Sequence, residues 1–258
     1  MSEMSDPNPE RIVTETRDHV LIVRMTRHAK RNAIDGEMTL ALDEALNRLD
    51  DDPDLWAGIL TGGPEMFCAG TDMAATSGRP TARGGIYGVV GRPRRKPLIA
   101  AVEGVAYGGG LEVVMACDLV VAASNARLAL PEVKRGLVAS SGALFRAGRV
   151  LPLNVAKQLL MTGADLPVSD AAAHGLVNTV CEPGGALDAA LELAAAICAN
   201  SPVAVQHSLR AVDRIVSSDD DDAWEVSREA AQSNRDSEDA AEGVAAFFEK
   251  RAPNWTGR

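Results

Sequence analysis

The chain has 258 residues, of which 46% are hydrophobic and 24% are charged, and its formal net charge is −10. This length and composition are ordinary for a globular protein with a full hydrophobic core. The acidic balance argues against nucleic acid as the main partner, because no net basic field attracts phosphates. The N-terminus MSEMSDPNPE is too polar for a signal peptide, and no stretch approaches the roughly 20 apolar residues of a membrane span. We therefore expect a cytoplasmic protein without a membrane partner.

The first 150 residues alternate between strand and helix patterns after a loose polar tail at residues 1–10. This alternation predicts an α/β fold with parallel strand pairing. Residues 73–96 are rich in Gly and Arg with weak periodicity, so we expect a mobile surface segment there. The predicted strands are 20–25, 56–61, 98–102 and 119–122, and the predicted helices of this part are 36–49 and 111–117.

Helical periodicity dominates from Leu153 to the C-terminus. The acidic run SSDDDD at 217–222 is typical of a solvated loop. A composition shift near residue 200, with Pro202 as a helix breaker, predicts a boundary between a core of residues 1–200 and a helical region of residues 201–258. The predicted helices of this part are 153–162, 168–174, 186–200, 202–216, 223–231 and 237–250.

The segment around the glycine run Gly108-Gly109-Gly110 is the strongest candidate for a functional site. Glycines let the backbone turn tightly and approach a ligand, and the helix that follows points unpaired N–H groups at it. Glu112 and Glu132 lie nearby in the sequence among mostly apolar residues. Donors for a developing oxyanion together with two carboxyls for proton transfer are what chemistry next to a carbonyl requires.

Each of these features also has an interpretation without chemistry. Glu112 can simply be an acid in the first turn of a helix, where it favours the helix dipole. Glu132 follows Pro131 and can be a solvated residue in a turn. The glycine run lacks the spacing of phosphate-binding loops, and Ser140-Ser141-Gly142 lacks the frame of a serine hydrolase. Occurring together, the two glutamates and the glycine run favour a catalytic site.

The remaining candidate sites are weaker. Cysteines 68, 117, 181 and 198 show no CxxC spacing and no paired histidines, so we expect no metal site. Basic residues cluster in three places and suggest a local anionic ligand, although most members can be solvated charges. These basic residues are Arg27, Lys30 and Arg31; Arg92, Arg94, Arg95 and Lys96; and Lys250 and Arg251.

Five motifs together resemble the crotonase superfamily, the enoyl-CoA hydratase/isomerase proteins, over essentially the whole chain. The motifs are RHAKRNAID (27–35), MFCAGTD (66–72), AYGGGLEVVMACD (106–118), LPEVKRGL (130–137) and EGVAAFFEKR (242–251). The resemblance implies a crotonase (ClpP-like) α/β spiral core built from ββα turns. It also implies that the C-terminal helices form an oligomerisation region.

The resemblance assigns roles to individual residues. The backbone N–H groups of Thr71 and Gly109 would bind the thioester oxygen. Glu112 would deprotonate a water molecule that attacks C3 of an enoyl-CoA, and Glu132 would deliver a proton to C2. Further positions match the coenzyme A site, two of them at the site of a neighbouring subunit. These positions are Lys30, Asn32, Ala33, Ala69 and Asp72, and then Phe247 and Lys250 for the neighbouring site.

Retention of both glutamates favours an enoyl-CoA hydratase, because isomerases of this family generally rely on the position of Glu132 alone. Double-bond isomerisation, dehydration of the carnitinyl-CoA type and a non-catalytic acyl-CoA-binding protein remain alternatives. One departure stands out: Ser140-Ser141-Gly142-Ala143 replaces the Gly-Ala-Gly-Gly of many hydratases. The resemblance further implies an acyl-CoA substrate, no cofactor besides the coenzyme A of that substrate, and a homotrimer or a dimer of trimers.

Overall fold

The computed structural model describes residues 10–217 and 219–256, and the predicted polar tail lies almost wholly outside them. Its centre is a six-stranded sheet in the order β1-β2-β3-β4-β6-β9, in which only the β1–β2 pair is antiparallel. The central strands β3 and β4 are buried along their whole length, as expected for parallel strands covered on both faces. The strands of this sheet are β1 (Ile12–Arg17), β2 (Val20–Met25), β3 (Ala57–Thr61), β4 (Leu98–Val102), β6 (Leu119–Ala123) and β9 (Thr179–Cys181).

A second sheet of three short strands extends the first and creates the repeated ββα unit. Its order is β5-β7-β8, with β5 (Val105–Tyr107), β7 (Arg127–Ala129) and β8 (Asp165–Pro167). Strand β4 continues after two residues into β5 and then into α2 (Gly109–Met115). Strand β6 continues into β7 and then into the 3-10 helix η3 (Pro131–Arg135). Because β5 and β7 are parallel neighbours, the helical turns that follow them begin side by side.

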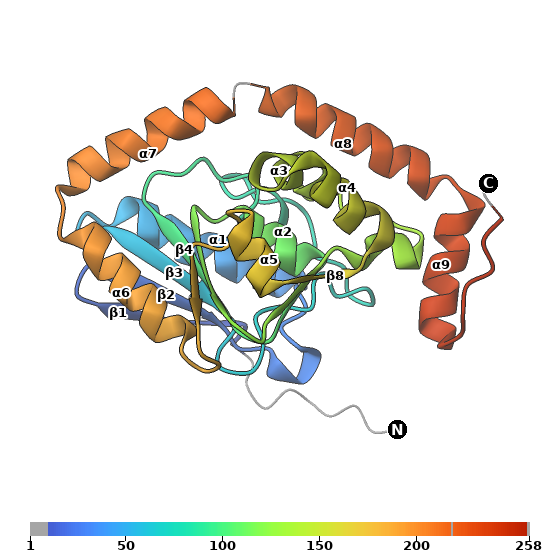
Figure 1. The fold of residues 1–258 in the computed structure, drawn as a ribbon, viewed down its shortest axis with the longest axis horizontal. Helices are drawn as coiled ribbons and strands as arrows, with labels where there is room; N and C mark the ends of the chain where they lie inside the picture. The colour runs from blue at the N-terminus through green and yellow to red at the C-terminus, as the bar shows by residue number, and fades with distance from the viewer. Residues whose placement is uncertain (1–9, 218, 257–258) are drawn as a thin grey trace.

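Helices cover both faces of the large sheet (Figure 1). Helix α6 packs its alanines 186, 190 and 194 against one face. The main core lies on the other face, where α1 and α2 pack. Asp35 caps α1 by accepting a hydrogen bond from Met38 N at 2.8 Å. The helices besides α2 are α1 (Gly36–Asp51), α3 (Ala143–Val150), α4 (Leu153–Thr162), α5 (Val168–Ala173), α6 (Ala186–Cys198), α7 (Pro202–Val216), α8 (Asp220–Arg235) and α9 (Glu238–Glu249), with the 3-10 helices η1 (His28–Lys30) and η2 (Ile86–Gly88).

The C-terminal helices follow a different course from the core. Figure 1 shows α7 and α8 running in an arc along the outside of the molecule, with α9 at its end. Helix α8 is held on α3, where the rings of Phe145 and Trp224 meet edge to face at 5.1 Å and Arg149 forms an ion pair with Asp220. None of the residues of α7 is buried within this chain.

Two sequence predictions were wrong. Residues 73–96 were expected to be a mobile surface segment, and residues 74–80 do lie at the surface. The later part contradicts the expectation: Tyr87 to Val90 are buried, and Arg92 is only 6% exposed and is paired with Asp43 and Asp50. The acidic run was expected to be a loop, yet α8 begins at Asp220 inside it. Carboxylates in the first turn of a helix are stabilised by the helix dipole, so this run starts a helix.

Candidate active site

Glu112 lies in the first turn of α2 and is 2% exposed. The apolar residues on either side of it place this helix inside the core, so the carboxyl is buried with them. Its Oε1 accepts a hydrogen bond from the backbone N–H of Ala143, at 3.2 Å, at the start of α3. Burial, and secondly the charge of Glu132, raise the pKa of Glu112 to about 8. The carboxyl can therefore exchange a proton near neutral pH.

Glu132 reaches the same place from η3. A Cβ on Gly108 would lie 3.0 Å from Glu132 Oε1, so the carboxyl packs directly against the glycine run. Its Oε2 is buried, and no residue in the described part of the chain hydrogen-bonds to it. Burial raises the pKa of Glu132 to about 7. The two carboxyls are electrostatically coupled, because the charge of Glu132 raises the pKa of Glu112, so ionisation of one opposes ionisation of the other.

Two backbone N–H groups lie beside the carboxyls. Gly109 is the first residue of α2, where the N–H has no acceptor within the helix. Thr71 forms a parallel bridge with Ile34, in which Ile34 N donates to Gly70 O and Asp72 N donates to Ile34 O. The N–H of Thr71 itself therefore points to the other side of its segment. On that side lie Tyr107 to Gly109, because a Cβ on Gly70 would be 2.8 Å from Tyr107 O and 3.3 Å from Gly109 N.

The predicted coenzyme A positions before the glycine run form one connected loop structure. Asn32 is fully buried, and its Nδ2 donates to the carbonyls of Gly62 and Phe67, each at 3.0 Å. Asn32 thus supports the loop that leads to Thr71, and the side-chain amide of Asn32 faces the protein interior and not the solvent. Asp72 pairs with Arg27 at 2.7 Å. Ala33 and Ala69 are half-buried and Lys30 is exposed.

The predicted C-terminal positions lie on the surface of α9. Phe247 is 43% exposed, and the guanidinium of Arg135 lies 5.1 Å from the centre of its ring. Lys250 is exposed and ends α9 in a left-handed conformation. Helix α9 packs on η3, because a Cβ on Gly243 would be 2.3 Å from Arg135 O. Phe247 therefore lies beside η3, the short helix that carries Glu132 in the same chain.

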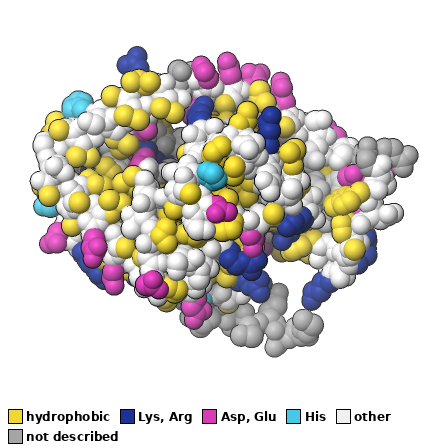
Figure 2. All heavy atoms as spheres, viewed as in Figure 1, with side chains coloured by type: hydrophobic (Ala, Val, Ile, Leu, Met, Phe, Trp, Pro, Cys, Tyr) yellow, Lys and Arg dark blue, Asp and Glu magenta, His cyan; other side chains and the backbone are white. Residues whose placement is uncertain are grey.

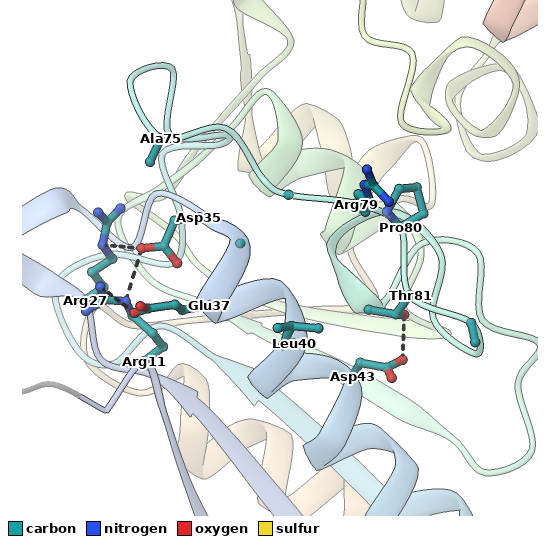
Figure 3. Close-up of a pocket in the computed structure, with 13 residues that line it drawn as sticks. Arg11, Arg27, Asp35, Glu37, Leu40, Asp43, Ala75, Arg79, Pro80 and Thr81 are labelled. Atoms are coloured by element: carbon teal, nitrogen blue, oxygen red, sulfur yellow. Dashed lines mark hydrogen bonds and ion pairs between the residues drawn. The ribbon is translucent and has the colours of Figure 1, made fainter.

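Each of the three basic clusters has one member that is neutralised within the chain. Arg27 pairs with Asp35 and Asp72, Arg92 pairs with Asp43 and Asp50, and Arg251 pairs with Glu242. A surface pocket of about 840 Å³ lies between the start of α1 and residues 75–82. Figure 3 shows Arg27, Arg11 and Asp35 grouped at one end of it. Neither glutamate lines this pocket, so it is separate from the carboxyl pair.

The sequence analysis missed Tyr87, which touches the site beside Ser141, a position already noted as a departure from the hydratase pattern. Tyr87 is 4% exposed, and its hydroxyl lies 2.7 Å from Thr71 Oγ1. Ser141 donates from Oγ to Tyr87 Oη at 3.2 Å. A Cβ on Gly109 would be 2.5 Å from Tyr87 Oη, so the phenol borders the first turn of α2. The signal in the sequence was a lone tyrosine in the glycine-rich stretch GGIYG, one of two tyrosines in the chain.

These groups together define a class of protein: an enzyme with acid–base carboxyls beside backbone donors for a carbonyl oxygen. A family model described as enoyl-CoA hydratase/isomerase matches residues 15–258. The enoyl-CoA hydratase EchA19 of Mycobacterium tuberculosis is 40% identical over 98% of both chains. The carnitinyl-CoA dehydratase of Proteus mirabilis is 37% identical over 94% of this chain and 97% of its own. The chain therefore belongs to the enoyl-CoA hydratase/isomerase family.

The solved structures confirm the predicted fold. The crystal structure of a carnitinyl-CoA hydratase from Mycobacterium avium superposes with a TM-score of 0.92 at 39% identity, covering 97% of this chain and all of that one. The α/β core of ββα turns is thus the crotonase fold. Within the described residues no single helix is long and apolar enough to cross a membrane; α6 and α7 pass together on length and composition but are bent by 105°.

Proposed function

We propose that this chain is an enoyl-CoA hydratase, which adds water across the 2,3 double bond of a trans-2-enoyl-CoA thioester. The observation that carries the proposal is the pair of buried carboxyls at Glu112 and Glu132, both with raised pKa values. Hydration needs one carboxyl as base and the other as acid at the same moment, and two coupled carboxyls with raised pKa values can each exchange a proton near neutral pH. Membership of the family and the EchA19 relative support the same reaction.

In this mechanism the N–H groups of Thr71 and Gly109 bind the thioester oxygen and stabilise the negative charge that it acquires. Loss of one such donor typically raises the barrier by about 3 kcal/mol. Glu112 accepts a proton from the water that attacks C3, and Glu132 gives a proton to C2. After the reaction Glu112 carries an additional proton and Glu132 has lost one. Transfer of one proton from Glu112 to Glu132, directly or through the bound product, restores the starting state. The reaction needs no cofactor besides the coenzyme A that is part of the substrate.

The proposal extends to the coenzyme A site and to assembly. Lys30, Ala33, Ala69 and Asp72 would line the coenzyme A site, with Asn32 supporting their loop from within the protein. Phe247 and Lys250 would reach the coenzyme A of a neighbouring subunit in a homotrimer or a dimer of trimers. The exposed C-terminal helices suit such contacts, and a cytoplasmic location, expected from the sequence, belongs to the same proposal.

A second candidate is dehydration of a hydroxyacyl-CoA, the same chemistry in the opposite direction. The carnitinyl-CoA dehydratase relatives favour it, as do the Tyr87 and Ser141 hydroxyls beside the carboxyls.

The test is to add the purified protein to crotonyl-CoA and follow the absorbance of its conjugated double bond, with chromatography of the product. A hydratase removes the absorbance and yields 3-hydroxybutanoyl-CoA. Unchanged crotonyl-CoA, with conversion of a 3-enoyl-CoA to the 2-enoyl form, would establish an isomerase instead. Turnover restricted to hydroxyacyl-CoA substrates would favour the dehydratase.

A further inference from the structure

Tyr87 is held in the site by an unusual backbone. Its φ is +58°, a left-handed conformation that costs a non-glycine residue free energy and that often marks a functional position. The turn around it is fixed on α1, because a Cβ on Gly88 would be 2.4 Å from Thr39 O. The strained conformation therefore persists because the packing of the turn leaves no alternative. The chain maintains this strain at the one tyrosine that faces the carboxyls.

The Tyr87 hydroxyl joins two parts of the proposed site. It lies 2.7 Å from Thr71 Oγ1, next to the proposed donor at Thr71 N. On its other side it accepts the hydrogen of Ser141 Oγ at 3.2 Å. Since Tyr87 accepts from Ser141, its own hydrogen is free to be donated to Thr71 Oγ1. Each hydroxyl in this partly buried row then has a partner.

Ser141 has one hydroxyl hydrogen and two acceptors within reach. One acceptor is Tyr87 Oη. The other is the carboxylate of Glu112, whose pKa is lowered by hydrogen bonding from Ser141 against the larger effect of burial. A hydrogen given to Glu112 would stabilise its charge and occupy a lone pair that a general base needs. Which acceptor holds the hydrogen therefore affects the basicity of Glu112.

We propose that Tyr87 is a positioning residue that accepts the Ser141 hydroxyl hydrogen and so keeps the carboxylate of Glu112 free to take a proton from water. The inference rests on the proposed role of Glu112 as the base. It also gives a purpose to Ser141, where many hydratases have a residue without a hydroxyl. Tyr87 acts through Ser141 and is not itself required to donate or accept a proton in the reaction.

Other charged groups face Glu112 and stay in place when Tyr87 is changed. Glu132 on η3 raises the pKa of Glu112. Arg146 on α3 interacts electrostatically with Glu112 and is anchored separately, by donating to Val90 O at 2.7 Å. A change at the Tyr87 hydroxyl therefore reports on the Ser141 hydrogen rather than on these charges.

The test uses Tyr87→Phe, which removes the hydroxyl and keeps the ring. Without its alternative acceptor, Ser141 donates to Glu112 and stabilises the carboxylate. We expect the apparent pKa on the acid side of the kcat–pH profile to fall by about half a unit to one unit. The KM for crotonyl-CoA should change little, because no contact to coenzyme A is removed. Ser141→Ala should leave the same pKa nearly unchanged, because in the unmodified chain Tyr87 and not Glu112 holds the Ser141 hydroxyl hydrogen.

A double-mutant cycle separates this role from a structural one. In the Ser141→Ala background, Tyr87→Phe should no longer shift the pKa, since the contested hydrogen is gone. Tyr107→Phe is the matched control, because Tyr107 donates to Asp165 at 2.6 Å outside the carboxyl pair. An unchanged pKa in Tyr87→Phe, or an equal shift in both backgrounds, would overturn the proposal.

A second readout does not depend on turnover. The infrared band of the protonated Glu112 carboxyl, identified by its loss in Glu112→Gln, can be titrated in each variant. If that band shifts as expected while no enoyl-CoA is hydrated, the hydrogen-bond arrangement stands and the proposed reaction fails. If the protein hydrates crotonyl-CoA but the band titrates alike in all variants, the role of Tyr87 is wrong.

Discussion

At the residue scale, burial of Glu112 and Glu132 raises the pKa values of both carboxyls, and these pKa values determine which proton transfers the site can carry out. An isolated buried carboxyl is normally a liability, because burial favours its neutral form. Here two of them approach the same glycine run from different elements, α2 and η3. The resulting pKa values near neutrality suit acid–base catalysis better than a solvated pair would.

Burial of Glu112 has a consequence for stability that can be measured without substrate. Its folded-state pKa lies above that of the unfolded chain, so the stabilisation from the neutral acid is complete below the unfolded pKa. That stabilisation is lost as the pH rises through about 8. Glu112→Gln is neutral at every pH and keeps the shape of the side chain. We therefore predict that its melting temperature relative to the unmodified chain increases between pH 5 and pH 9.

Thermal denaturation of both proteins across this pH range checks the prediction. Glu192→Gln, at an exposed position of α6, provides the control. The difference in melting temperature between this variant and the unmodified chain should not change with pH. A difference for Glu112→Gln that does not vary with pH would show that Glu112 titrates as an ordinary carboxyl.

At the element scale, close packing of α2 on the loop before Thr71 aligns the site. A Cβ on Gly110 would lie 2.4 Å from Cys68 O, so α2 touches backbone there. Glycine is thus needed for the approach of the two segments that carry Gly109 and Thr71.

Gly110→Ala should therefore destabilise the protein by about 1–3 kcal/mol, because the backbone must shift to admit the methyl group. It should also lower kcat by separating the two N–H donors. Gly148→Ala, in α3, is the matched control: its Cβ would meet only Leu153 Cδ1, at 3.7 Å, so the higher helix propensity of alanine should stabilise it or leave it unchanged. Melting temperatures and crotonyl-CoA turnover decide between these outcomes, and equal behaviour of the two variants would refute the packing argument.

Elements with a long periodic pattern were predictable from the sequence, and short ones were not. The predicted helices 153–162 and 202–216 match α4 and α7, and the predicted strand 98–102 matches β4. Strands β5, β7 and β8 have three residues each, too few for a pattern, and exist only because they pair with one another. Both glutamates were identified from motifs. Tyr87 was missed because its segment is ordered by contacts with α1, a helix that lies far from Tyr87 in the sequence.

At the scale of the whole molecule, the C-terminal helices have apolar side chains that remain exposed in the single chain. Val212, Ile215 and Val216 of α7 are each more than half exposed. Figure 2 shows hydrophobic side chains at the surface where Figure 1 places α7 and α9. Exposed apolar surface of this kind is typical of an interaction site.

We predict that the protein in solution is a trimer or a hexamer whose contacts include α7. Light scattering coupled to size-exclusion chromatography should give three or six times the chain mass of 27.1 kDa. Ile215→Asp should shift the mass toward the monomer, because the carboxylate would be buried in the contact. His207→Asp, at an exposed polar position of the same helix, serves as the control. A monomeric unmodified chain would contradict the prediction.

The central claim is that Glu112 and Glu132 are the acid–base pair of an enoyl-CoA hydratase. The most direct measurement compares hydration of crotonyl-CoA by the unmodified chain, Glu112→Gln and Glu132→Gln, after circular dichroism has shown that all three are folded. We predict that each variant loses about 10²–10⁴-fold in kcat, because general acid–base catalysis contributes about that much. Near-full activity in either variant would contradict the account.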